Sequence, residues 1–431
     1  MIYLILFLGF IIRLININQS LWLDEAITAQ AVKTYSLANL ITKFSPGDFH
    51  PPFYYLILKL WSNLFGYSEI TLRLPSVIFG LAVVYFVYLI GRKLFNQKVA
   101  LLASLFLAIN PLAIYYSQEA RMYSLAMLAV TASIYFFLEK RWLWWFFCLL
   151  VAMYSDYLPW LILPVFVLIT NKKKLLISHF LLLFVAFIPW LPILWKQLSN
   201  GASVTVILPE WGNLLGGFSI KGLALVFVKF IIGRISLDNK IIYAIVITSI
   251  GAVYFWLMIR VRNRILWIWL LLPIILGLII SLKIPVFTYF RFLFVLPAFI
   301  LLLAAGASRN KIFVLFVSLV SFGCLLIFNS NSSFQRDNWR DAVLYMEKNN
   351  GIALLPSLAT VSPINYYRQN LPVYDPQNFP DLKPHQPVFL IRYVQEIFDP
   401  KDSLRQQLEF NGYAKTEVKN FNQLVIWRYD K

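Results

Sequence analysis

Long apolar runs constrain this chain more than any other feature. An α-helix needs about 17–25 consecutive apolar residues to cross a bilayer, and runs close to that length recur along the first three quarters of the sequence. We predict eleven membrane spans, near residues 1–15, 70–91, 99–116, 121–138, 142–155, 157–170, 175–195, 240–259, 265–282, 290–307 and 311–329. The first run lacks a basic leading segment and a small-residue cleavage site, so we interpret it as an uncleaved anchor.

The composition excludes a soluble globular protein. Hydrophobic residues make up 60% of the chain and charged residues 13%, whereas an ordinary soluble domain has about 25% charged residues. The formal net charge of +18 belongs almost entirely to residues 1–333, which hold 26 of the 38 basic residues and 9 of the 20 acidic ones. These basic residues are scattered between apolar runs, so nucleic-acid binding does not explain them. The sequence predicts a polytopic α-helical membrane protein.

Short basic connections predict the orientation of the spans. Connections rich in Lys and Arg tend to stay on the cytoplasmic side of a membrane. They are Arg92–Lys98, Lys140–Arg141, Lys172–Lys174, Arg260–Arg264 and Arg309–Lys311. All of them fall on one side only if the apolar run 218–233 does not cross, so we interpret that run as an interfacial or re-entrant segment. With a cytoplasmic N-terminus, the connections 16–69 and 196–239 and the tail 334–431 face outward from the cytoplasmic membrane.

The acidic residues of the membrane part gather on the predicted outward side. Eight of the nine lie there: Asp24, Glu25, Asp48, Glu69, Glu119, Asp156, Glu210 and Asp238. Only Glu139 falls on the inward side. The positive-inside rule concerns basic residues and does not predict this asymmetry. It therefore indicates a functional site at the outer face.

The tail 334–431 is nearly neutral, with 12 basic and 11 acidic residues, and predicts a small extracytoplasmic α/β domain. We expect helices over 339–349 and 403–410 and strands over 352–355, 387–393 and 424–428. Fewer than 100 residues make a marginal core, so we expect this domain to lean on the membrane domain 1–333.

Two adjacent carboxylates, Asp24 and Glu25, follow the first predicted span in the sequence Ser20-Leu-Trp-Leu-Asp24-Glu25-Ala-Ile-Thr28. Carboxylates are too costly to face lipid. One interpretation is a solvated loop in which Asp24 caps a helix. The flanking Leu and Trp residues instead favour a position at the membrane interface, where the pair can take part in chemistry.

Two further motifs face the same side. His50 stands before Pro51-Pro52 and an aromatic helix, a helix-start signal that would place the imidazole near an anion or a metal, although a lone His is more often a surface or capping residue. Glu119 and Arg121 lie in a very short outward connection. They either pair with each other and their neighbours or provide a second carboxylate and a phosphate-binding guanidinium.

Arg73 and Arg291 stand at the outer ends of predicted spans. Arginines in such positions often snorkel to the membrane surface, and taken singly this is the simpler interpretation for each. Cys148 and Cys324 both lie in apolar runs, so neither a disulfide framework nor a zinc site built from cysteines is expected.

The order of four motifs resembles the bacterial and archaeal branch of the integral-membrane GT-C glycosyltransferases, which is similar to the protein O-mannosyltransferases and to the aminoarabinose transferase that acts on lipid A. The motifs are LWLDEAIT, HPPFYYLILKLW, SEITLRLPSVIFGLAVVYFVYLIGRKLF and NPLAIYYSQEARMYSL. The resemblance is close through about Lys140. It extends more weakly through VFTYFRFLFVLPAF and the tail.

The resemblance implies a sugar donor carried on a polyprenyl phosphate at the outer membrane face. It implies a catalytic role for Asp24, as base or organiser of the reacting centre, with Glu25 as its neighbour and Glu119 in the second acidic motif. It implies phosphate contacts for His50 and Arg291, although Tyr289-Phe290-Arg291-Phe292 stands where relatives often have Arg-Tyr.

Our prediction adds Arg73 and Arg121 to the cations that bind the donor phosphate. It assigns Tyr54, Tyr55, Tyr123 and Tyr289 to the substrate groove. Some relatives use a divalent metal ion, and the ligand set of this sequence leaves that cofactor open.

We therefore predict a membrane glycosyltransferase that moves a sugar to an envelope glycan, lipid or protein acceptor, with inversion and with Asp24 as base. The lipid bilayer is an expected partner and nucleic acid is not. One alternative is a transporter or flippase of lipid-linked sugars, although transporters usually place ionisable groups at the membrane midplane and show internal repeats. Another is a non-catalytic envelope assembly protein whose tail binds a partner.

Overall fold

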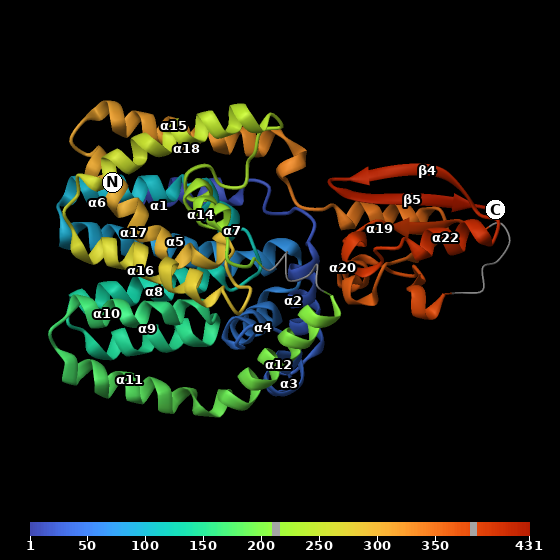
Figure 1. Cartoon of the computed structure of the whole chain (residues 1–431), viewed down its shortest axis with the longest axis horizontal. Coiled ribbons are helices and arrows are strands. Elements are labelled where there is room, and N and C mark those ends of the chain that lie inside the picture. Colours follow the sequence, from blue (N-terminus) through green and yellow to red (C-terminus); the bar gives the residue numbers. More distant parts are fainter. Residues whose placement is uncertain (209–215, 380–385) are drawn as a thin grey trace.

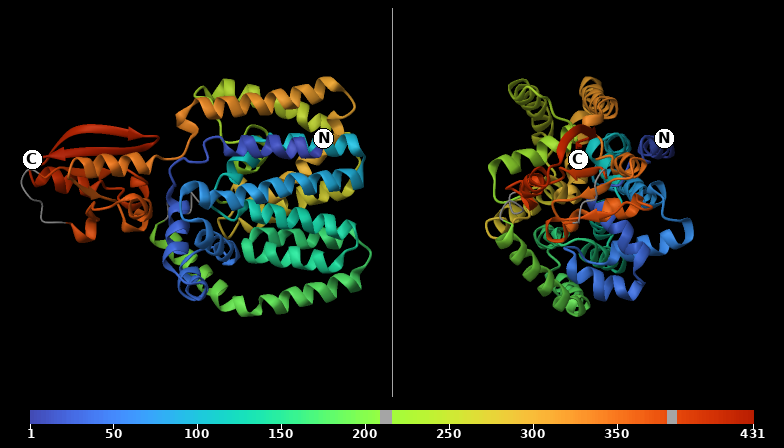
Figure 2. Two further views of the ribbon diagram at one scale, coloured as in Figure 1. Left: turned by 180° about the vertical axis from the view of Figure 1, so that it is seen from behind. Right: turned by 90° about the vertical axis from the view of Figure 1, so that its right-hand side faces the viewer.

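The computed structural model describes residues 1–208, 216–379 and 386–431. A bundle of long helices forms the larger part, and a smaller α/β unit stands beyond one end of it (Figures 1 and 2). The bundle helices are α1 (Ile2–Leu14), α5 (Glu69–Leu94), α6 (Gln97–Ala108), α7 (Pro111–Ser117), α8 (Tyr123–Leu138), α9 (Trp142–Ser155), α10 (Leu163–Ile169), α11 (Lys173–Phe187), α15 (Lys240–Ile259), α16 (Arg264–Ile280), α17 (Leu296–Ala307) and α18 (Lys311–Ser330).

The predicted spans coincide with helices. Among the described residues, five helices are long and apolar enough to cross a membrane, and α6 with α7, bent by 60° at their junction, makes a sixth candidate. The bend falls at Asn110–Pro111, where proline disfavours helical geometry in the residue before it and the Asn110 side chain caps α7. Five shorter apolar helices correspond to the other predicted spans.

Helices α2 (Leu23–Thr34), α3 (Leu37–Asn39), α4 (Phe53–Phe65) and α12 (Leu191–Ile207) lie at the end of the bundle that faces the α/β unit (Figure 1). The other short elements of this part are η1 (Leu40–Phe44), η2 (Ser45–Gly47), α14 (Ile220–Ile232) and η5 (Tyr289–Val295). The connection 16–69 is therefore largely helical, and α4 begins directly after Pro51-Pro52, as predicted. Helix α14, with 13 residues, is not among the span candidates of the described chain.

The chain is still helical after residue 195, where we predicted that the loop 196–239 begins. The stretch Lys173–Val204 is one apolar helical segment, bent where η4 (Ile188–Trp190) joins α11 to α12. Helix α12 therefore continues beyond the predicted end of the span at 195 as far as Ile207, with Gly201 in its interior. One predicted outward carboxylate, Glu210, lies outside the described residues.

The α/β unit holds a five-stranded mixed sheet in the order β2-β1-β3-β5-β4. Its strands are β1 (Ile352–Leu354), β2 (Val373–Tyr374), β3 (Val388–Ile391), β4 (Ala414–Phe421) and β5 (Leu424–Asp430). Strands β2, β1 and β3 pair in parallel, whereas β5 is antiparallel to both β3 and β4. The predicted helices correspond to α19 (Trp339–Lys348) and α22 (Ser403–Phe410). Strand β4 was not predicted because its sequence, AKTEVKNF, is mostly polar and its side chains stay largely exposed at the sheet edge.

Hydrogen bonds join the α/β unit to α2 and to the start of α5. Helix α20 (Ser362–Tyr367) provides three of them: the Tyr367 hydroxyl accepts from the Leu21 amide over 2.8 Å, the Tyr366 hydroxyl donates to the Tyr67 carbonyl over 2.5 Å, and the Ser362 carbonyl accepts from Gln30 over 3.0 Å. The expected contact between the tail and the membrane domain is present. It covers the end of the bundle where the predicted site residues lie.

The remaining short elements connect these units. They are η3 (Leu158–Ile162), η6 (Ser332–Phe334), η7 (Leu358–Thr360), η8 (Pro376–Asn378) and α21 (Gln395–Phe398).

Candidate active site

Glu25 and Arg73 form a fully buried ion pair. Arg73 donates to the two carboxylate oxygens of Glu25 over 2.8 and 2.5 Å, and its other N–H groups donate to three carbonyls within Ile17–Ser20. Glu25 also accepts from the Ala120 amide over 2.8 Å. Although burial opposes ionisation, the charges of Arg73 and Arg336 hold the pKa of Glu25 below its usual range. With every donor of Arg73 engaged, the geometry favours a structural role for this pair over direct contact with substrate.

Asp24 is differently placed, although it is the next residue in α2. Its side chain is 35% exposed, and its Oδ2 lies 3.8 Å from Nη2 of Arg121. Within the described ranges its carboxylate accepts no hydrogen bond, and only its backbone carbonyl does, from Thr28. Asp24 therefore offers an accessible, unengaged carboxylate beside a cation.

Arg121 and His50 lie together beside Asp24. Nη2 of Arg121 is 3.3 Å from Nδ1 of His50, and Nη1 donates to the Tyr55 hydroxyl over 3.4 Å. The Tyr55 hydroxyl in turn donates to Asp48 over 2.6 Å, and the same carboxylate oxygen lies 3.6 Å from His50. Burial would raise the pKa of Asp48, but the hydrogen bond and charge of His50 and the charge of Arg121 lower it to about 2. Asp48 is thus an anion that orients Tyr55 and His50 beside Arg121.

Glu119 is nearly fully buried at the bend between α7 and α8. Its Oε2 lies 3.7 Å from Nη2 of Arg336, and its Oε1 has no hydrogen-bond partner among the described residues. Burial raises the pKa of Glu119 to about 7, although the charge of Arg336 acts in the opposite direction. This carboxyl therefore changes its charge near neutral pH.

Two more arginines lie close to this centre. Arg234, which follows α14, donates to the Tyr115 hydroxyl and stacks 4.6 Å from the centre of its ring. Arg291 lies on η5, close enough to Tyr123 for an electrostatic interaction between the two side chains. Its side chain makes no hydrogen bond within the described parts of the chain, so Arg291 retains free donors. Between Arg291 and Tyr289, the Phe290 ring packs 5.4 Å from that of Tyr123.

The predicted groove tyrosines are not equally available. Tyr54 is fully buried and shares a 3.1 Å hydrogen bond with Ser76, so it stabilises packing and does not line an open groove. Tyr55 is also buried but takes part in the site through Asp48 and Arg121. Tyr289 is only partly buried, and Tyr123 is 6% exposed.

Sequence reasoning missed Arg336, Asp48 and Arg234 as members of the site. Asp48 lies two residues before His50, so a closer interpretation of that motif would have found it. Arg234 directly follows the apolar run 218–233, and no motif surrounds it. Arg336 belongs to the predicted tail domain, and no local pattern connects it with α2.

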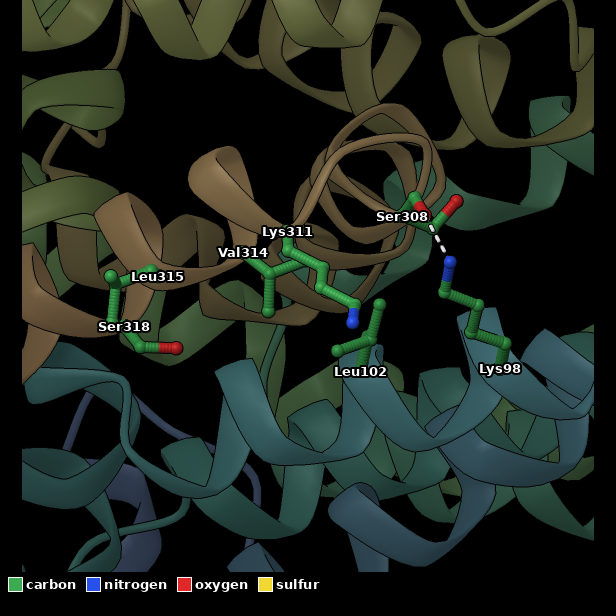
Figure 3. A pocket seen from close by; sticks show the side chains of 7 residues that line it. All are labelled: Lys98, Leu102, Ser308, Lys311, Val314, Leu315 and Ser318. Carbon is green, nitrogen blue, oxygen red and sulfur yellow. Dashed lines mark hydrogen bonds between the residues drawn. The ribbon is translucent and has the colours of Figure 1, made fainter.

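In the described chain, a cavity of about 340 Å³ lies between α6 and α18, at the end of the bundle away from Asp24. Figure 3 shows the side chains that line it. Lys98, Ser308 and Lys311 border it, together with apolar side chains of α6 and α18. Glu139, the one acidic residue predicted to face inward, is the membrane-domain carboxylate that pairs with Lys93, over 3.0 Å. Neither feature contacts the cluster around Asp24.

One family model matches part of the chain. Residues 49–195, which include His50, Arg73 and Arg121, match the model of the family described as Dolichyl-phosphate-mannose-protein mannosyltransferase. This match covers about a third of the chain. A search of the curated proteins by sequence finds no match.

Solved structures show that the chain has an ArnT-like GT-C fold. It is similar to ArnT from Cupriavidus metallidurans in the apo state, with 13% identity, a TM-score of 0.60, and coverage of 99% of this chain and 97% of that one. ArnT bound to undecaprenyl phosphate gives 14% identity, a TM-score of 0.57 and the same coverage. The Archaeoglobus fulgidus oligosaccharyltransferase in complex with Zn and sulfate gives 14% identity and a TM-score of 0.54, over 88% of this chain and 62% of that one.

Proposed function

We propose that this glycosyltransferase transfers a sugar from a polyprenyl-phosphate donor to an acceptor hydroxyl, with Asp24 as the catalytic base. The supporting observation is the difference among the carboxylates of the site. Glu25 is locked by Arg73, Asp48 accepts from Tyr55, and Glu119 is nearly fully buried. Asp24 alone of the four combines 35% exposure with an oxygen free of hydrogen bonds from the described residues.

The reaction then follows from the positions of the charges. The Asp24 carboxylate takes the proton of the acceptor hydroxyl, whose oxygen forms a bond to the anomeric carbon. The bond between that carbon and the phosphate oxygen breaks, and its electron pair leaves with the polyprenyl phosphate. A single displacement from the side opposite the phosphate inverts the anomeric centre, because no protein nucleophile intervenes.

Side chains that retain free or weakly engaged N–H donors are the candidates for holding the phosphate. Arg121 and His50 lie beside Asp24, and Arg291 has no hydrogen-bonded partner in the described chain. Guanidinium groups stabilise a departing phosphate through charge-assisted hydrogen bonds. Arg73 leaves this proposed set, because all its donors already serve Glu25 and backbone carbonyls.

ArnT has been crystallised with undecaprenyl phosphate, which supports a polyprenyl-phosphate donor for this chain as well. The partly buried aromatic residues Tyr289 and Phe290 of η5 lie beside Arg291 and are candidates to contact the sugar or the first isoprene units. The acceptor remains one of three classes: an envelope glycan, a lipid or a protein.

A divalent metal ion does not fit the residues of this site well. In the described chain no three His, Cys, Asp or Glu side chains come together as a ligand set. The one His–Asp pair, His50 with Asp48, already has Arg121 beside it, with the guanidinium 3.3 Å from the imidazole. We therefore assign the stabilisation of negative charge to arginine and derive no step through a metal.

The orientation of the site is proposed from the charges of the connections. The short basic connections stand at the end of the bundle away from Asp24, and such connections stay cytoplasmic. The site and the α/β unit would then face outward from the cytoplasmic membrane. A transporter is disfavoured, because the carboxylates cluster at one end of the helices and not at their midpoints.

A comparison of four strains tests the proposal. They are a deletion strain and the same strain restored with the wild type, with Asp24→Asn or with Asp238→Asn, all at equal protein level. Asp238 is an exposed carboxylate outside the cluster and provides the matched control. We expect wild type and Asp238→Asn to restore one sugar mass on an envelope molecule, and Asp24→Asn to lose at least about 100-fold in transfer rate. Equal restoration by Asp24→Asn would refute the role of this residue.

A further inference from the structure

Arg336 reaches the active site from the segment that joins α18 to the α/β unit. Its side chain is almost fully buried, with Nε 3.4 Å from Oε2 of Glu25 and Nη2 3.7 Å from Oε2 of Glu119. Its guanidinium also lies 4.6 Å from the centre of the Tyr115 ring. A single cation from the C-terminal part therefore stands between two buried carboxylates of the membrane part.

Glu25 and Glu119 differ in how far their negative charge depends on Arg336 as a nearby cation. Glu25 already has Arg73 as a bidentate partner. Glu119 has one cation within ion-pair distance among the described residues, and that cation is Arg336. A buried carboxylate without a nearby opposite charge favours its protonated form, so the charge of Glu119 depends chiefly on the placement of Arg336.

Other charged groups around Glu119 are engaged elsewhere. The titratable and charged groups that face it are Glu25 from α2, Tyr54 from α4, Tyr115 and Tyr116 from α7, Arg121, Tyr123 from α8, Arg234 and Arg336. Arg121 contacts Asp24, His50 and Tyr55, and Arg234 donates to Tyr115. Neither Arg121 nor Arg234 forms an ion pair with Glu119 in the described chain, so neither takes the place of Arg336.

The position of Arg336 is fixed by the docking of its own segment. The Arg336 amide donates to the Gln19 side chain over 3.1 Å, and the Arg340 amide donates to the Ser20 hydroxyl over 3.1 Å. The Arg340 side chain pairs with Glu69 over 2.5 Å. The chain that carries Arg336 is thereby attached to the segment that also surrounds Arg73.

We propose that Arg336 is a positioning residue of the transfer reaction, which holds Glu119 as a carboxylate beside Glu25 and so makes the docked C-terminal unit part of the active site. The inference rests on the proposed function. Glu119 Oε1 and the Nε and Nη2 groups of Arg336 are buried and lack hydrogen-bond partners in the described chain. Arg336 therefore acts on Glu25 and Glu119 through its charge, at 3.4 and 3.7 Å.

The test measures transfer rate against pH for the wild type, Arg336→Gln, Arg336→Lys and Arg392→Gln. Arg392 is the matched control, because it is an arginine of the same C-terminal unit that pairs with Asp402 and contacts neither Glu25 nor Glu119. We expect Arg336→Gln to lose at least about tenfold in rate near pH 6.5 and much less near pH 9, because removing the cation shifts protonation of Glu119 to higher pH. Arg336→Lys keeps the charge and should recover part of the loss.

A uniform loss at every pH in Arg336→Gln would overturn the proposal and leave Arg336 a packing residue. The same pH-dependent loss in Arg392→Gln would also overturn it, since a general weakening of the C-terminal unit would then explain the effect.

An assay without substrate separates this inference from the proposed function. Burial raises the pKa of Glu119 above its usual value, so its contribution to folding stability is present at low pH and is lost as pH rises through about 7. Without Arg336 the ionised carboxylate lacks its partner. The fall in melting temperature between pH 6 and 9 should therefore be larger in Arg336→Gln than in wild type or Arg392→Gln. Equal falls in all three would refute the inference even if no sugar transfer is detected, whereas a larger fall without transfer would refute only the proposed reaction.

Discussion

Arg73 encloses Glu25 with two hydrogen bonds of 2.8 and 2.5 Å, and neither side chain is exposed to solvent. This pair fixes the start of α2 against α5, because Arg73 also binds the carbonyls that lead into α2. The neighbouring Asp24 consequently has a defined position. The structure thus separates two adjacent carboxylates into one that supports the site and one that faces it.

Glu25→Gln should destabilise the fold. The neutral amide would leave the buried Arg73 cation without its anion, and removing one partner of a buried pair costs about 3–5 kcal/mol. We expect a lower melting temperature in detergent and a lower yield of folded protein. Asp24→Asn removes the same charge one residue away and should melt close to the wild type. If the two variants melt alike, the Glu25–Arg73 pair does not carry the stability assigned to it.

Arg121→Lys and Arg291→Lys should weaken donor binding. Lysine keeps the charge but loses the planar fork that contacts phosphate through two N–H groups, and a hydrogen bond to a charged group contributes about 1.5–3 kcal/mol. The KM for the polyprenyl-phosphate donor should rise by roughly tenfold or more in each variant. Arg92→Lys changes an exposed arginine at the far end of the bundle and should leave KM unaltered. An unchanged donor KM in both site variants would remove them from the phosphate site.

Much of the fold follows from the hydropathy of the sequence. Apolar runs predict the helices of the bundle because a helix in lipid satisfies its own backbone hydrogen bonds. The break between α6 and α7 fits the presence of Pro111, although the sequence analysis treated 99–116 as one span. Polar edge strand β4 carries no comparable pattern.

The different environments of Asp24, which is partly exposed, and Glu25, which is buried against Arg73, were not predictable. The sequence indicated only a pair of outward carboxylates. Adjacent residues of an α-helix point about 100° apart, so the helical state of α2 directs one towards Arg73 and the other towards Arg121. The role of Arg336 was even harder to predict from the sequence. Its contact with Glu25 and Glu119 depends on docking of the C-terminal unit, which local spacing does not encode.

Glu119→Gln should flatten the dependence of stability on pH. Burial raises the pKa of Glu119 to about 7, so the folded protein holds a proton that the unfolded chain releases at lower pH. Its stabilising contribution is complete below the unfolded pKa and is lost as pH rises through about 7. Glutamine cannot ionise, so the melting temperature of the variant should fall less between pH 4.5 and about 7 than that of the wild type. Parallel melting curves for the two proteins would assign the pH dependence to other groups.

Gly306→Ala should destabilise the packing of α17 against α15. A Cβ at Gly306 would lie 2.2 Å from the carbonyl oxygen of Leu257, which is backbone and has little room to move. Overpacking of this kind costs about 1–3 kcal/mol, so we expect a lower melting temperature and reduced activity through loss of folded enzyme. Gly323→Ala on α18 is the matched control, because a Cβ there meets no atom within 4 Å and alanine is the better helix former. A melting temperature of Gly306→Ala equal to that of Gly323→Ala would contradict the close approach of the two helices.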